Sequence, residues 1–569
     1  MSDKKTYLIS SRREGESEPD TPRERVVIEV PADPTIQPFT FDDNSPHIFP
    51  EKDASREHAL LAGIMPFLKI DQKDMVEEYT ALYQKCLNGT SPDQGPRLID
   101  ATFVLMTEQL RLALQPTRNL VDRKIREGLV TGGLIDVYFD IVMREGFLLE
   151  HAAIVEAIFD TLADLCLYGR ENVLTADALL RRGPQFWEYV WNHKAQLRLQ
   201  SETELQVIPM VIAYHSTHRL RHGGNSQSNP RPDTFLPQVA IYLFTHAQVR
   251  NGMIQCILRP MLFMAKYGHG NIRVPIPERE EFVQQAIIDG AGPDAFLSRM
   301  ESELKHPPVL GGDFFSSIGT LIHISCSPTM LPYLEGYDPV HLLVSTFDRT
   351  YTQGSVLKTS VLEQIFVAIH VHFRVYMDDF LNEMIDSKHC TVTIRGDDAV
   401  KLMALSIYIL LSTKDKSLVT DIRNNLLKEI REWSATAINI ESKACKYTGA
   451  PAVLSSMRSG AREDWWPSLR MLQDAPYREG LGAKGHATLL RAWTDFGRLL
   501  GLEEDKEKAR HEKEARTHCS WRSCVYFKTL APHELKTCAG CSEVRYCGRE
   551  CQKSDWTRGG HKKRCKRLK

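Results

Sequence analysis

The feature that most constrains this chain is a cluster of metal-binding residue types near its C-terminus. Seven of the thirteen cysteines fall between positions 519 and 565, together with one suitably spaced histidine. The spacing is Cys519-x4-Cys524-x13-Cys538-x2-Cys541-x5-Cys547-x3-Cys551-x9-His561-x3-Cys565. Eight thiolate and imidazole donors suffice for two closed tetrahedral sites, which is the arrangement that structural zinc prefers. We therefore expect this part of the chain to fold around two structural Zn²⁺ ions.

The spacing within several ligand pairs also allows both members of the pair to bind one ion. Cys538-Ala-Gly-Cys541 reads as a tight turn, in which we expect Gly540 to adopt the positive φ that brings both sulfurs onto one ion. The last two ligand pairs each have i, i+4 spacing, so both members of a pair can lie on one face of a short helix. So short a segment buries little apolar surface, and without metal it should unfold.

Two other histidines adjoin the cluster and are weaker candidates for ligands. His518 precedes Cys519 and could replace it, and His533 lies in the loop before Cys538. The remaining cysteines are scattered singly among apolar neighbours, as expected of buried free thiols. They are Cys86, Cys166, Cys256, Cys326, Cys390 and Cys445.

The rest of the sequence predicts a mostly α-helical structure. Residues 1–52 are rich in Pro and charge and are expected to be disordered. Residues 53–500 form a succession of amphipathic segments of helical length, which predicts an all-α body. Residues 501–517 carry charge on every side and should form a solvated helical connector. Residues 518–569 are the cysteine-rich module.

Parts of the body resemble one another. Two apolar segments end at Tyr-Gly, at 168–169 and 267–268, and Gly- and Pro-containing loops precede later helix starts. Stacked helix pairs, as in armadillo or HEAT arrays, would produce this pattern, although a non-repetitive helical domain also fits. Two stretches, 217–233 and 449–476, look too polar for a core, and the first should be a surface loop.

The segment Tyr546-Cys-Gly-Arg-Glu-Cys-Gln-Lys-Ser-Asp-Trp556, followed by His561-Lys-Lys-Arg-Cys565, closely resembles the MYND-type zinc finger. A helical body followed by a C-terminal finger is also the layout of some fungal MYND proteins. The resemblance implies a cross-braced pair of sites, in which the first and third ligand pairs share one ion and the second and fourth share the other. This chain departs from the usual pattern at the first pair, which is spaced x4, and before His561, where the approach is longer.

The resemblance also implies a function, because MYND fingers bind short proline-containing peptides beside their second helix. Gln552 and Trp556 match the family positions that line the groove, with Val544 and Tyr546 on an extended segment nearby. We therefore expect a zinc-binding adaptor with protein partners. A role as an accessory protein of a ubiquitin ligase is a weaker extension, since a fungal protein of this layout acts with such a ligase.

The sequence gives little support for an enzymatic function. No nucleotide-binding, serine-hydrolase or metalloprotease motif is present. A SET-type methyltransferase is disfavoured because its signature is missing, and a RING finger because histidine is here the seventh of eight ligands. The paired acids Asp397 and Asp398 are expected to be solvated. We expect a non-enzymatic protein.

Charge leaves one alternative open. Residues 519–569 contain thirteen Lys and Arg against four Asp and Glu, so a transcriptional or nucleic-acid-binding role for the basic tail is the competing hypothesis. Part of that charge would instead offset the metal-bound thiolates. The first twenty residues lack an apolar leader and no run is long enough to span a bilayer, so we expect an intracellular protein of cytoplasm or nucleus.

Overall fold

The protein is described from a computed structural model, which is mostly helical, as the sequence predicts. The structure describes residues 71–87, 98–114, 121, 123–169, 172–197, 207–222, 234–247, 257–258, 276–305, 312–325, 327–334, 336–353, 395–413, 415–443, 449–475, 481–521, 524–527, 529–557 and 561–565. The segment 1–52, predicted to be disordered, lies outside these residues. No helix in the described ranges is long and apolar enough to cross a membrane.

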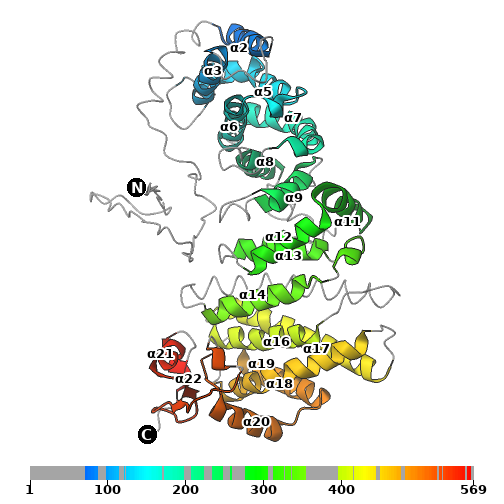
Figure 1. Ribbon diagram of the computed structural model, residues 1–569, viewed down its shortest axis with the longest axis vertical. Coiled ribbons are helices and arrows are strands. Elements are labelled where there is room, and N and C mark those ends of the chain that lie inside the picture. The colour runs from blue at the N-terminus through cyan, green and yellow to red at the C-terminus, as the bar shows by residue number, and fades with distance from the viewer. Residues whose placement is uncertain are drawn as a thin grey trace, which may run out of the picture. The chain divides into compact units, whose positions relative to one another are not determined.

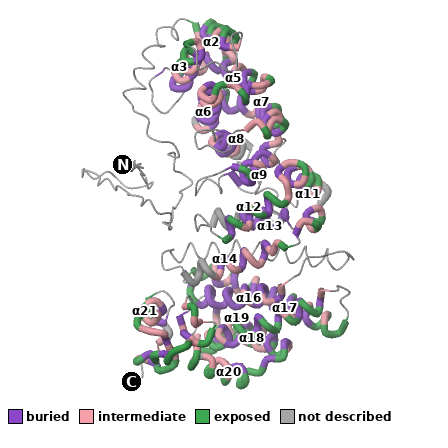
Figure 2. The backbone as a smooth tube through the Cα atoms, in the orientation of Figure 1, coloured by how far each residue is buried: buried purple, intermediate pink, exposed green. Residues whose placement is uncertain are grey.

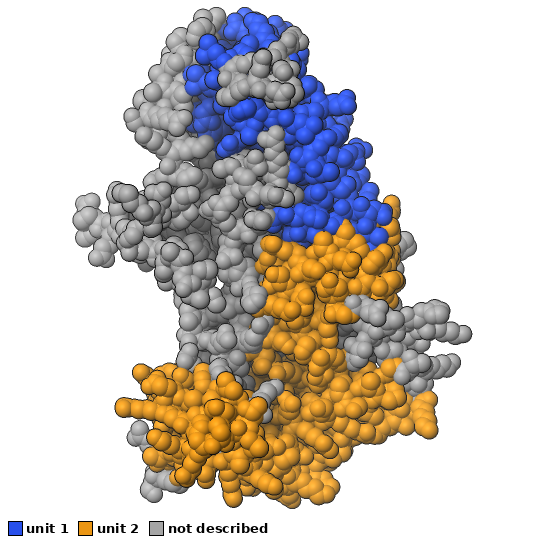
Figure 3. Space-filling view, in the orientation of Figure 1, with its two compact units in different colours: residues 1–263, 268–272, 285–291 blue, residues 264–267, 273–284, 292–569 orange. Residues whose placement is uncertain are grey.

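The chain divides into two compact units (Figure 3). The first unit contains α2 (Gln72–Leu87), α3 (Leu98–Leu114), α4 (Arg123–Thr131), α5 (Leu134–Val142), η2 (Phe147–Leu149), α6 (Ala152–Gly169), α7 (Val173–Asn192), η3 (Lys194–Gln196), α8 (Val207–His222), α9 (Leu236–His246) and most of the π-helix η5 (Gln284–Ala291). Helices that are not consecutive in the chain pack together: α3, α6 and α8 contact in succession, and so do α5, α7 and α9. Helix pairs that stack side by side have this pattern (Figure 1).

A row of packed aromatic side chains lies in the core of the first unit. The rings of Phe139, Phe186, Trp187 and Tyr214 contact one another edge to face, with centroids 4.7–5.5 Å apart. Gly183 packs against this aromatic row. A Cβ added at this position would lie 1.7 Å from the Tyr214 hydroxyl oxygen. α8 itself continues to His222, so the start of the stretch 217–233 is helix rather than the predicted loop.

The second unit contains α11 (Ile276–Val283), α12 (Pro293–Lys305), α13 (Gly312–Ser325), η6 (Leu331–Tyr333), α14 (Pro339–Gln353), α16 (Gly396–Ser412), α17 (Lys416–Glu441), α18 (Ala450–Asp474), α19 (Gly482–Leu499) and α20 (Glu504–Thr517). The C-terminal module adds η7 (Val525–Phe527), β1 (Lys536–Thr537), β2 (Arg545–Tyr546), α21 (Arg549–Thr557) and α22 (His561–Arg564). Alternate helices again pack, α12 on α14, α14 on α16, α16 on α18 and α17 on α19.

Helix α18 corrects the prediction that residues 449–476 are too polar for a core. It packs extensively on α16, whose residues are almost all buried (Figure 2). The apolar residues of α18 recur at three- and four-residue spacing and are buried, whereas the charged ones occupy the opposite face. The average polarity of the segment hid this periodicity. Its buried apolar side chains are Val453, Leu454, Met457, Trp465, Trp466, Leu469 and Leu472.

Trp465 is the centre of this packing. Its indole Nε1 donates to the backbone oxygen of Trp493 on α19 at 2.7 Å, and the side chain is 1% exposed. Gly497 lets the two helices approach, since a Cβ there would lie 2.1 Å from Trp465 Cε2. The indole of Trp493 in turn donates to the hydroxyl of Ser468 at 3.1 Å. Apolar burial and satisfied indole N–H groups therefore hold α18 to α19.

We expected from the sequence that both of the paired acids at the start of α16 would be solvated, but one of them is buried. Asp398 is 3% exposed and accepts a hydrogen bond from His341 Nδ1 on α14 at 2.9 Å. Arg395 lies 3.9 Å from the same carboxylate and 2.9 Å from that of Asp397. The partner histidine is distant in sequence, so the local pattern could not indicate that this acid is buried. An ion pair therefore connects α14 to α16.

This contact predicts a pH-dependent stability. The hydrogen bond with Asp398 raises the pKa of the half-buried His341, with burial and Arg395 opposing and Asp338 assisting. A raised pKa means that the pair stabilises the fold fully below the pKa of unfolded histidine and loses this contribution as pH rises through the folded value. His341→Gln should therefore lower the urea midpoint more at about pH 5.5 than at about pH 8.5. An equal loss at both pH values would contradict the ion pair.

The connector predicted to be solvated is helical but packs on one side. α20 lies against α18, and Glu507 is buried. Arg510 and His511 both hydrogen-bond the backbone oxygen of Arg462, and Gln473 donates to Glu504 at 2.8 Å. Arg470 on α18 also pairs with Glu543 of the C-terminal module at 3.1 Å. Within this unit the ion pair links the module to α18, in addition to the covalent connection through α20.

Candidate metal centre

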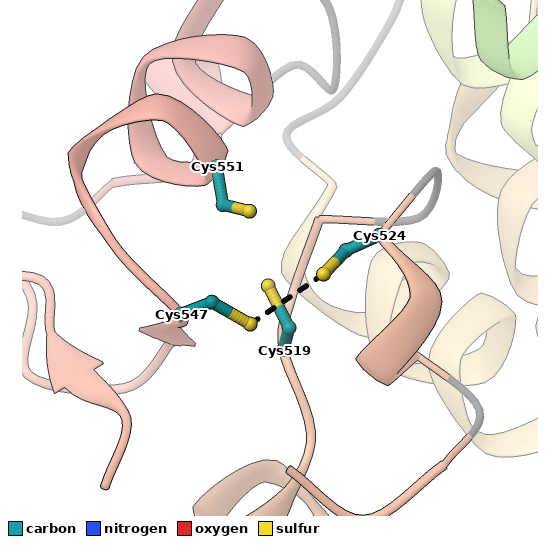
Figure 4. Close-up of side chains that lie close together, drawn as sticks. All are labelled: Cys519, Cys524, Cys547 and Cys551. Atoms are coloured by element: carbon teal, nitrogen blue, oxygen red, sulfur yellow. Dashed lines mark hydrogen bonds between the residues drawn. The ribbon is translucent and has the colours of Figure 1, made fainter. Parts of the chain in front are cut away.

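Four cysteine sulfurs meet at the first candidate site (Figure 4). Cys519 follows α20, Cys524 precedes η7, Cys547 follows β2 and Cys551 lies in α21. Their Sγ atoms all lie within 4.8 Å of one another, and those of Cys524 and Cys547 are 3.5 Å apart. The four side chains point toward one centre from separate segments (Figure 4). This is the geometry of four ligands around one ion.

Three cysteines and one histidine form the second site. His561 Nε2 lies 3.3 Å from Cys538 Sγ and 3.7 Å from Cys541 Sγ. Cys565 Sγ lies 3.9 Å from Cys538 Sγ, and all four ligand atoms lie within 4.8 Å of one another. His561 is 3% exposed. The imidazole therefore presents Nε2 to the three sulfurs from the start of α22.

The two groups interleave along the chain. The first site takes the first and third ligand pairs, and the second site takes the second and fourth. These are the groupings that the resemblance implied. Each ion would therefore hold together two segments that are separated in the sequence by ligands of the other ion. The folding of each site thus depends on the other.

A short hairpin positions the second ligand pair. Lys536 pairs with Tyr546 and Thr537 with Arg545, and the Cys538 N–H donates to the Val544 oxygen at 2.9 Å. Gly540 does not provide the positive φ that we expected. Ser542 does, with φ 57°, and its N–H returns to the oxygen of Cys538 at 2.9 Å. The turn therefore closes one residue after Cys541 rather than one before it.

The neighbouring histidines have other roles in the structure. His518 Nδ1 contacts the backbone oxygen of Glu514 at 3.0 Å, and the ring of His533 packs edge-on against Tyr526. Among the described residues neither belongs to a group that could hold a metal. Cys519, at 1% exposed, occupies the position for which His518 had been an alternative.

Crowding among the thiols opposes the ionisation of some of them. Burial and the neighbouring Cys519 charge raise the pKa of Cys551 to about 12, and burial and Cys538 raise that of Cys565 to about 11. For Cys538 burial opposes ionisation, but hydrogen bonds from His561 and from nearby backbone outweigh it and lower the pKa to about 6. Zn²⁺ would supply the compensating charge, so the donor set fits this metal.

All four positions at each site are taken by protein ligands. A catalytic zinc keeps a position open for water or substrate, whereas a structural zinc has a closed shell. The chain therefore has two structural zinc sites, and what they can do chemically is to hold segments together.

The small core between the sites contains one residue that sequence reasoning missed. Asp555 is 2% exposed and accepts a hydrogen bond from the Tyr546 hydroxyl at 2.7 Å, which ties α21 to β2. Tyr546 is 1% exposed, so it belongs to this core and not to the surface where we had placed it. A carboxylate within a charged helix gives no local signal that it is buried.

Gln552 and Trp556 lie on α21, four residues apart and thus on one face of the helix, and both are half-buried. The indole of Trp556 packs edge-on against His561, with ring centroids 5.8 Å apart. The tryptophan therefore contacts a zinc ligand on one side and is partly exposed on the other. Val544 is also half-buried.

The outer edge of β1 is open in the described part of the chain. Because the Cys538 N–H points inward to the Val544 oxygen, the alternation of an antiparallel ladder turns the N–H and C=O of Thr537 outward. The equivalent groups of Arg545 on β2 are both used, by the N–H and hydroxyl of Ser520. No backbone partner for Thr537 is found among the described residues. This edge could pair with an extended peptide.

Comparison with known proteins agrees with the geometry. The family model for the MYND finger matches residues 517–565. No curated protein and no solved structure matches the chain. The matched range contains all eight ligands of the two interleaved sites. Residues 517–565 are a MYND-type zinc finger with two Cys/His metal sites.

Proposed function

We propose that this protein is a non-catalytic adaptor, in which the MYND finger binds a short proline-containing segment of a partner. The observation that carries the proposal is the combination of two closed metal sites with a partly exposed Gln552 and Trp556 on α21. Closed sites argue against chemistry at the metal, and a rigid, half-exposed tryptophan is the side chain that most often dominates peptide contacts. The open edge at Thr537 offers backbone hydrogen bonds to the same kind of ligand.

Replacing Trp556 tests this proposal. The zinc-loaded full-length chain is applied to an array of proline-containing peptides as wild type, as Trp556→Ala and as Glu550→Ala, which changes an exposed residue of the same helix. We expect Trp556→Ala to weaken binding at least about tenfold, as loss of an anchor does, and Glu550→Ala to change it less than about twofold. Zinc content is measured for each variant to show that the finger is intact.

Unchanged binding by a zinc-loaded Trp556→Ala protein would contradict the groove assignment. The competing hypothesis of nucleic-acid binding gives a different result. It predicts that DNA or RNA binds the full chain with an affinity that falls steeply as salt rises, and that Trp556→Ala leaves this affinity in place.

A further inference from the structure

The exposure of α21 changes gradually around the helix. At about 100° per residue, Asp555, Gln552, Trp556, Arg549 and Lys553 follow one another around the axis. In that order Asp555 is buried, Gln552 and Trp556 are half-buried, and Arg549 and Lys553 are exposed. The proposed peptide-binding residues therefore have the small core on one side and two cations on the other.

The finger does not neutralise these two cations. Arg549 and Lys553 form no ion pair with any residue that the structure describes, and this includes Glu550, three residues before Lys553. Residues 519–569 contain thirteen Lys and Arg against four Asp and Glu, and two Zn²⁺ ions would offset four of the seven thiolate charges. The finger therefore stays positively charged with its metals bound, and a negatively charged ligand suits this side of α21.

The positions of the cations determine where a carboxylate of the ligand would have to lie. An α-helix rises about 1.5 Å per residue, so along the axis Lys553 is about 4.5 Å from Trp556, and Arg549 is about 10.5 Å from it. An extended proline-containing peptide advances about 3.1 Å per residue. A carboxylate that meets either cation while a proline contacts Trp556 therefore lies within about four residues of that proline.

We propose that the partner segment carries aspartate or glutamate within about four residues of its prolines, and that Arg549 and Lys553 pair with these carboxylates. The inference rests on the proposed function and names the chemistry of the ligand at the same surface. Contact between proline and Trp556 supplies most of the affinity. The cations select among proline-containing segments and speed their association.

The test varies only the position of the acids in the ligand. The probe is the peptide that binds the zinc-loaded full-length chain most tightly in the array, labelled with a fluorophore and made in two forms of identical composition. The near form has an aspartate two residues from the outermost proline on each side, and the far form has it beyond eight residues of glycine and serine. Such a spacer keeps the charge about 16 Å away on average, beyond the screening length of about 8 Å at physiological salt. By fluorescence anisotropy we expect the near form to bind at least about fivefold more tightly.

Charge reversal in the full-length chain identifies the cations. Lys553→Glu and Arg549→Glu should each remove most of the advantage of the near form. A peptide with lysine at the two near positions should bind Lys553→Glu more tightly than it binds wild type. The matched control is Lys508→Glu, which makes the same change of charge at an exposed residue of α20, outside the finger. It should change the ratio of near to far binding by less than about twofold. Zinc content is measured for every variant, so that a misfolded finger is recognised.

The outcomes separate this inference from the proposed function. Equal binding of the near and far forms by the zinc-loaded chain overturns the inference and leaves the proposed function standing. A preference for the near form that survives both charge reversals does the same. If no proline-containing peptide binds, both fail. A DNA duplex that displaces the near form, and that Trp556→Ala binds as well as wild type does, would assign the two cations to nucleic acid and overturn the inference.

Discussion

Removing zinc from the full-length chain is expected to unfold the finger and to leave the helical units folded. A structural zinc contributes on the order of 10–16 kcal/mol in small finger peptides, which is more than the finger's other interactions can replace. Among the described residues of the finger, few side chains besides the ligands are buried, chiefly those of Trp521, Leu535 and Tyr546. Limited proteolysis with mass spectrometry should show cleavage within residues 519–565 only after chelation.

A pair of serine variants provides the control. Cys538→Ser removes a ligand and should expose the finger to protease without chelator, whereas Cys86→Ser removes a buried thiol of α2 that belongs to neither metal group in the described chain. Circular dichroism should keep most of its helical signal in both. A finger that resists protease after complete chelation would show that burial alone maintains it.

Replacing Trp465 with alanine is expected to destabilise the second unit by about 3–5 kcal/mol. The change leaves a large cavity between α18 and α19 and removes the donor to the backbone oxygen of Trp493. Trp465→Phe should cost less, since it keeps most of the apolar contact and loses chiefly the hydrogen bond. Urea unfolding followed by tryptophan fluorescence and circular dichroism gives the free energies.

Ser459→Ala, at an exposed position of the same helix, is the control and should change the stability by less than about 0.5 kcal/mol. If Trp465→Ala unfolded at the wild-type urea concentration, the residue could not be the centre of the packing that we describe.

The fold could be predicted from the sequence where amphipathic periodicity was strong. The segment that became α6, and most of those that became α16 and α17, carried apolar residues at helical spacing, and the structure places helices there. The prediction that residues 449–476 are too polar for a core was wrong because we judged the segment by its average polarity. In α18 the arginines and acids share the exposed face, and Gly460 lies against Asp397, where a Cβ would be 2.7 Å from its Cα.

The metal centre was more predictable because its ligands are few in kind and fixed in spacing. Spacing alone identified pairs such as Cys538 and Cys541, but it does not determine which pairs share an ion, since that depends on tertiary structure. The family resemblance implied this grouping. Neither source indicated Ser542 as the left-handed residue or Asp555 as a buried partner of Tyr546, because both depend on contacts between separate segments.

Cadmium-113 NMR of the full-length chain, reconstituted with cadmium in place of zinc, tests the cross-braced finger most directly. The chemical shift of this nucleus reports how many thiolates surround it, and Cd²⁺ accepts the same thiolate and imidazole donors. We predict two signals of equal intensity, one from a four-thiolate site and one from a site of three thiolates and an imidazole. Cys524→Ser should change the first directly, and His561→Ala the second. A single signal, or two signals from identical donor sets, would contradict the assignment of Cys519, Cys524, Cys547 and Cys551 to one ion and of Cys538, Cys541, His561 and Cys565 to the other.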